Sequence, residues 1–149
     1  MLNIAIITML LVVPYAVAHV LGLNEVIAGR VGIAAVFAFT ALGHFAKADA
    51  MLPMLPSWMP WRRALIYTSG ILEILFVLAL LAGFALFGIG LSIVAYLILI
   101  LPSNIYAAVQ RIPFGGHSIG PRYLLVRLPC WCVGFIGSLS EAFSRMSAW

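Results

Sequence analysis

The chain has 149 residues, of which 65% are apolar and only 8% are charged. Soluble domains carry about 25% charged residues, so this composition excludes a soluble globular protein and indicates a chain surrounded by lipid. The net charge of +4 comes from scattered Lys and Arg residues without a long basic block, which excludes a nucleic-acid-binding surface.

The N-terminal part of the chain predicts two membrane-spanning helices in quick succession. Residues 2–22 form an apolar run of about the 20 residues that a bilayer crossing requires. The run lacks the cationic start of a secretory signal, so we expect it to be retained as a span. A turn-like Gly-Leu-Asn-Glu segment follows, and the second predicted span is 26–46, with Arg30 near its start and His44 near its end.

The middle of the chain predicts an interfacial loop followed by a helical hairpin. Residues 47–63 combine three prolines with tryptophans and cations, a composition typical of the headgroup region. The 46 residues from 64 to 109 contain a single charge, Glu73, and are too long for one crossing. We therefore expect spans at 64–83 and 88–109, with a turn among the glycines that separate them, Gly83, Gly88 and Gly90.

A second interfacial loop, 110–122, and a fifth span, 123–143, complete a predicted single all-α transmembrane domain over residues 1–149. Cations concentrate in the loops after the second and fourth spans, and by the positive-inside rule those loops and the N-terminus are cytoplasmic. These cations are Lys47, Arg62, Arg63, Arg111 and Arg122.

Glu73 is the first candidate site residue, because a carboxyl group inside an apolar span is costly and marks a functional site by default. Ser69 and Gly70 precede it by four and three residues, so the three share a small, polar helix face that we expect to point into the bundle. The structural alternative is that Glu73 only makes a hydrogen bond or an ion pair with Arg127 in the last predicted span.

Further polar residues fall at compatible depths in the cytoplasmic half of the predicted bundle. His44 lies near the end of the second span, and His117 follows two glycines in the second loop. Asn104 follows a helix-kinking proline, Pro102, while Arg127 lies near the start of the last span, where it could also snorkel to the interface. No metal-ligand spacing occurs among the histidines and carboxylates, so no metal site is predicted.

Five segments resemble motifs of the DoxX-like family of small bacterial integral membrane proteins: 40–45, 54–60, 68–73, 101–108 and 112–129. The resemblance implies a four-helix core in the bacterial inner membrane, to which residues 2–22 would add an extra N-terminal span. It also implies motif positions at His44, Glu73, Pro102, Asn104, His117 and Arg127. Relatives include subunits of membrane redox complexes, so the resemblance does not decide between an enzyme and a non-catalytic subunit.

Two classes of function fit these residues. In the first, Glu73 with His44 or His117 exchanges protons with a lipophilic small molecule such as a quinone, whose polar end Asn104, Arg127 and Ser69 bind. In the second, the polar residues only stabilise a non-catalytic membrane subunit or assembly factor. Small residues on the second span, Ala28, Gly32 and Ala35, would then contact another helix or a partner. A transporter is less favoured because five spans show no inverted repeat. No cofactor is predicted by any motif.

Overall fold

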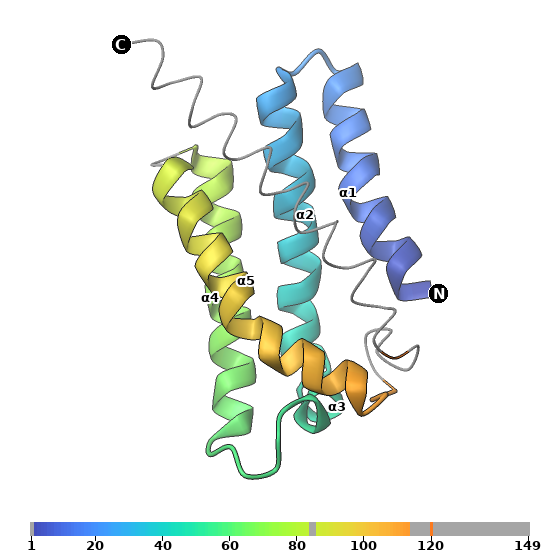
Figure 1. Ribbon diagram of the computed structural model, residues 1–149. Coiled ribbons are helices and arrows are strands. Elements are labelled where there is room, and N and C mark those ends of the chain that lie inside the picture. Colours follow the sequence, from blue (N-terminus) through green and yellow to red (C-terminus); the bar gives the residue numbers. More distant parts are fainter. Residues whose placement is uncertain (1, 84–85, 114–119, 121–149) are drawn as a thin grey trace.

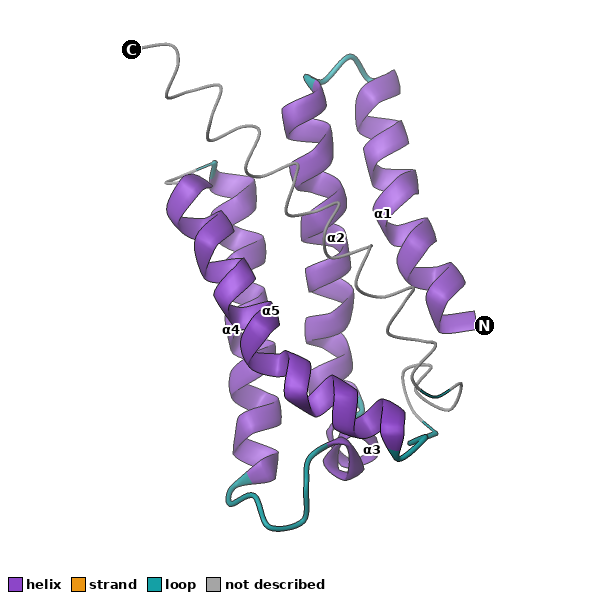
Figure 2. Cartoon of the chain, in the orientation of Figure 1, coloured by secondary structure: helices purple, strands orange, loops and turns teal. Residues whose placement is uncertain are grey.

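The computed structural model describes residues 2–83, 86–113 and 120, and within them the fold is entirely helical (Figures 1 and 2). Three of its helices are long and apolar enough to cross a membrane: Ile27–Ala46, Arg62–Ala82 and Phe87–Val109. Such helices indicate a lipid bilayer environment. The predicted fifth span, 123–143, lies outside the described residues.

The first two helices form an antiparallel pair. Helix α1 spans Leu2–Val20 and α2 spans Glu25–Ala46, so both begin and end within two residues of the predicted bounds. The chain reverses at Gly22, whose φ of 75° suits a residue without a side chain. Figure 1 shows α1 alongside the first half of α2. Ala28 and Gly32 of α2 are buried and Ala35 is half-buried, which agrees with a close helix contact on this face.

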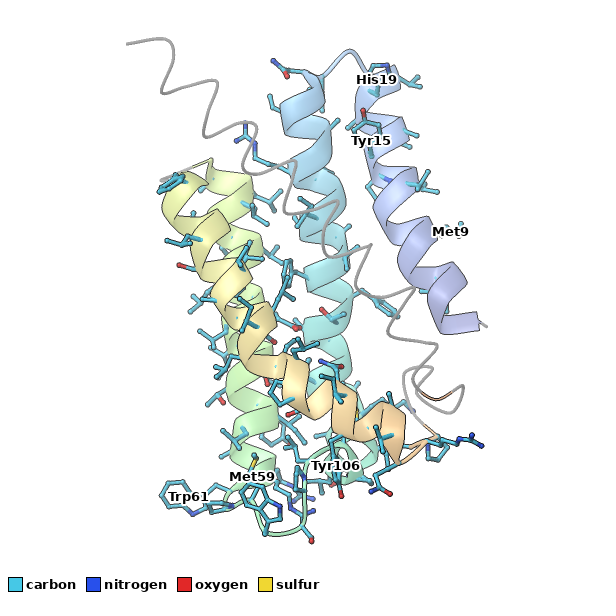
Figure 3. All side chains as sticks on the ribbon, viewed as in Figure 1. Met9, Tyr15, His19, Met59, Trp61 and Tyr106 are labelled. Atoms are coloured by element: carbon cyan, nitrogen blue, oxygen red, sulfur yellow. The ribbon has the colours of Figure 1, made fainter. Side chains whose placement is uncertain are left out.

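The predicted interfacial loop is partly helical. It contains one short α-helix, α3 (Ala48–Met51), and one 3-10 turn, η1 (Leu52–Met54), before the chain turns into α4 at Trp61. Trp58 and Trp61 are 78% and 84% exposed. Figure 3 shows Trp61, Met59 and Tyr106 at one end of the bundle and His19 at the opposite end. This distribution fits aromatic residues that anchor a bundle at headgroup level.

The hairpin predicted for residues 64–109 is formed by α4 (Arg62–Ala82) and α5 (Leu86–Val109). Of the three glycines considered for the turn, Gly83 ends α4 in the left-handed conformation, with φ of 67°. Gly88 and Gly90 lie inside α5, which begins at Leu86. The connection between the two helices is therefore shorter than the predicted one, in which the next span began at residue 88. The backbone N–H of Gly83 bonds back to the oxygen of Leu80, which closes the last turn of α4.

Packing is closest between α2 and α4, and α5 crosses in front of α4 (Figure 1). A core cluster of Ala34, Phe37, Leu80 and Tyr96 joins the three helices. Phe76 lies between Phe37 and Tyr96 and contacts both rings edge to face, with centroid distances of 5.8 and 5.5 Å. Helix α5 contains Pro102 and changes direction along its length in Figure 1, as a helix does where proline removes a backbone donor.

Candidate functional site

Glu73 of α4 lies at the centre of the candidate site and is only 4% exposed. The hydroxyl group of Tyr96 on α5 donates a hydrogen bond of 2.8 Å to its Oε1 atom. Its Oε2 atom lies 3.3 Å from Nδ1 of His44 on α2. Among the described residues, the polar neighbours of the carboxyl group are therefore Tyr96 and His44, each from another helix. The pairing with Arg127 stays a prediction, because Arg127 lies outside the described residues.

His44 is held by its own helix as well as by Glu73. Its Nδ1 atom is 2.8 Å from the backbone oxygen of Thr40, closer than the 3.3 Å that separates it from Oε2 of Glu73. Both neighbours are acceptors, so Nδ1 is the ring nitrogen that carries a hydrogen in the neutral imidazole. Because Thr40 takes the shorter bond, Oε2 of Glu73 is a buried oxygen without a hydrogen-bond partner among the described residues.

Gly70 allows α2 and α4 to approach closely enough for this contact. A Cβ atom on Gly70 would lie 2.9 Å from Cβ of His44 and 3.0 Å from the ring of Phe45. Real Cβ atoms do not approach so closely, so any side chain here would displace α2. Gly70 and Glu73 of the predicted small face are therefore buried in the bundle, whereas Ser69 is half-buried, and Gly70 lies against His44.

Tyr96 is a residue of this site that the sequence alone did not single out. Two signals identify it in retrospect. A tyrosine deep in an apolar helix needs a partner for its hydroxyl group. In addition, residues of an antiparallel hairpin lie level when they are equally far from its turn, and Glu73 and Tyr96 are placed symmetrically about residues 84–85.

Ser69 and Asn104 bond to their own helices. The Ser69 hydroxyl donates to the backbone oxygen of Leu65 at 2.6 Å, and the Asn104 side-chain amide donates to that of Ile100 at 2.9 Å. Asn104 is 4% exposed. It lies eight residues beyond Tyr96 on α5, toward the end where Lys47 and Arg63 lie.

His117 and Arg127 lie outside the described residues. Among the residues that are described, no three His, Cys, Asp or Glu side chains gather as a metal site would require. The described part of the site therefore consists of a carboxyl group, an imidazole and a phenol, which are groups that bind and exchange protons.

Comparison with known proteins places the chain in one family. The family described as "Domain of unknown function (DUF8561)" matches residues 33–136, and the protein belongs to it. The match includes most of α2 and all of α4 and α5, which carry His44, Glu73 and Tyr96. No curated protein and no solved structure matches the chain. The resemblance to the DoxX-like family stays a prediction.

Proposed function

We propose that this protein binds a lipophilic small molecule, of the quinone or quinol class, at an acid–base site centred on Glu73. The observation that carries the proposal is the Oε2 atom of Glu73, which is buried without a hydrogen-bond partner among the described residues, while Oε1 accepts a bond from Tyr96. Leaving a polar atom in this condition costs about 1–3 kcal/mol. A ligand hydroxyl or carbonyl group at Oε2 would remove that cost.

The chemistry of the three side chains suits such a ligand. A protonated Glu73 can donate to a quinone carbonyl, and an ionised Glu73 can accept the proton of a quinol hydroxyl. Tyr96 donates a hydrogen bond to one oxygen of the carboxyl group, and His44 lies 3.3 Å from the other. In this proposal His117 is a second proton-exchanging residue, and Asn104, Arg127 and Ser69 bind the polar end of the ligand. Electron transfer would require a redox partner and is not proposed.

The proposed setting is the bacterial inner membrane, with the ends of the helices that carry Lys47, Arg62 and Arg63 facing the cytoplasm together with the N-terminus. The support is the positive-inside rule, since these cations are at one end of the bundle and Arg30 lies against Gly83 at the other. A DoxX-like four-helix core with α1 as an added span is part of the same proposal, and its support is the order of the five motifs.

Equilibrium binding of decylubiquinone to the full-length protein in lipid nanodiscs tests the proposal. We expect saturable binding by the wild type and an affinity at least about tenfold weaker for Glu73→Gln, which equals about 1.4 kcal/mol. Asp49→Asn is the matched control, because this substitution also removes a carboxylate but at an exposed site on α3. Unchanged affinity in a folded Glu73→Gln variant would contradict the proposal.

A second candidate function is that of a non-catalytic membrane subunit or assembly factor, which acts in a larger membrane complex or as a homo-oligomer. One observation favours it: His44, Glu73 and Tyr96 connect α2, α4 and α5, and polar contacts of this kind stabilise helix association in membranes. If the protein has this function, Glu73→Gln should lower only its thermal stability in detergent. Mild purification should also recover a stoichiometric partner.

A further inference from the structure

We propose that protons reach Glu73 through His44, from the end of the bundle where α2 is followed by α3, and not from the opposite end at Gly83. This inference rests on the proposed acid–base function and adds to it a direction of proton access. It is carried by three observations: the contact between the two side chains, the apolar packing on one side of Glu73, and the polar surface on the other.

The contact allows direct proton transfer. Nδ1 of His44 donates its hydrogen to the backbone oxygen of Thr40 and lies 3.3 Å from Oε2 of Glu73, so a small rotation of the ring turns the hydrogen from the first acceptor to the second. In the transfer step the Nδ1–H bond breaks and an Oε2–H bond forms, while Nε2 takes up a proton from water. The ring thus changes tautomer without a change in its net charge, and the carboxylate becomes a neutral acid. The reverse step returns the proton to the aqueous side.

Apolar side chains fill the bundle between Glu73 and the Gly83 end. The core cluster includes Phe37 of α2 and Leu80 of α4. Phe37 precedes His44 on α2, and Leu80 follows Glu73 on α4, so both lie on the Gly83 side of the site. Partly buried apolar residues from the same three helices pack against this cluster: Ile33, Phe76, Val77, Ile89 and Ile93. Water needs polar partners to occupy such a region, so the described residues offer no proton path in this direction.

The other direction is short and increasingly polar. The side chain of His44 is 16% exposed, against 5% for Glu73, so His44 is the more accessible of the two. Lys47, one helical turn further along, is exposed, and so is Asp49 on α3, which pairs with Arg63 of α4. The titratable groups that face Glu73 in the described residues are His44 from α2 and Tyr96 from α5.

Chemical labelling in sealed proteoliposomes tests the direction of access. A lipophilic carbodiimide reacts with protonated carboxyl groups, so acidification of the side that supplies protons should accelerate modification of Glu73, quantified by peptide mass spectrometry. Lys47 is the single lysine of the chain. Its reaction with a membrane-impermeant amine reagent therefore reports which end of the protein faces outward.

We expect the labelling rate of Glu73 to rise by up to about tenfold per pH unit when the Lys47 side is acidified, and to stay constant when the other side is acidified. In His44→Phe this preference should fall to less than about twofold. Labelling that follows the Gly83 side or neither side in the wild type would overturn the proposal. So would an undiminished preference in His44→Phe. The assay contains no quinone, so its result is independent of the binding experiment.

Discussion

The hydroxyl group of Tyr96 and Oε1 of Glu73 are 2.8 Å apart, and the bond between them connects α5 to α4 inside the apolar part of the hairpin. Tyr96→Phe removes this donor and keeps the ring in contact with Phe76. We expect the free energy of unfolding to fall by about 1 kcal/mol, the size of an interhelical hydrogen bond in a membrane protein.

Thermal unfolding in detergent measures this effect, and Tyr15→Phe is its control because Tyr15 is 40% exposed on α1. Equal midpoints for Tyr96→Phe and wild type would show that the bond contributes nothing to helix association.

Gly70→Ala should harm both stability and ligand binding. The added Cβ atom would lie 2.9 Å from that of His44, so α2 must move away from α4. We expect a loss of about 1–3 kcal/mol in stability, and weaker quinone binding because His44 no longer lies beside Glu73. Gly88→Ala is the matched control, since nothing lies within 4 Å of its added Cβ atom.

The control variant should be neutral or slightly more stable, because alanine favours helix by about 1 kcal/mol over glycine. If Gly70→Ala behaved in the same way as Gly88→Ala in thermal unfolding, the close approach of α2 and α4 would be refuted.

Gly83 ends α4 beside Arg30. Comparison with Gly22 separates the effect of its positive φ from the effect of its contact with Arg30. Gly22 and Gly83 both have positive φ, of 75° and 67°. A Cβ atom on Gly83 would lie 2.8 Å from Nη1 of Arg30, whereas nothing lies within 4 Å of one on Gly22. Both Ala variants should lose about 1 kcal/mol through backbone strain.

Gly83→Ala should lose more than Gly22→Ala, because it also displaces a guanidinium group from the negative end of the α4 dipole. Chemical denaturation in mixed micelles measures the difference, and equal losses would contradict the role assigned to Arg30.

Asn104→Ala tests whether the second buried polar side chain belongs to the ligand site. If its amide binds the polar end of the ligand, decylubiquinone affinity should fall about tenfold, or 1.4 kcal/mol. If the amide acts only on the backbone oxygen of Ile100, binding should be unchanged and only the stability of α5 should fall. Titration of the ligand into nanodisc samples distinguishes the two results.

Much of the fold was predictable because bilayer crossing imposes a length and a composition on each helix. The bounds of α1, α2, α4 and α5 therefore follow from hydropathy and from the glycine, proline and polar residues that separate the apolar runs. The exact turn did not, because Gly83, Gly88 and Gly90 all permit a reversal and only packing selects one. The short helix α3 was also missed, because the prolines, tryptophans and cations of residues 47–63 led us to predict an interfacial loop there.

The candidate site was predictable where burial itself is costly. Glu73 and His44 can be identified from the sequence because they are ionisable groups in apolar helices, and in the structure they lie side by side. Tyr96 was missed because its ring is an ordinary packing group and its importance lies only in the hydroxyl position. The role of the Thr40 backbone oxygen could not be inferred from residue type at all.

The central claim is that a lipophilic ligand binds at Oε2 of Glu73, and protection from chemical labelling tests it most directly. Decylubiquinone should slow the reaction of Glu73 with a lipophilic carbodiimide in a saturable manner. Labelling of exposed Asp49 by a water-soluble carbodiimide should stay unchanged in the same samples. Modification of Glu73 at an undiminished rate under saturating ligand would contradict the proposed site.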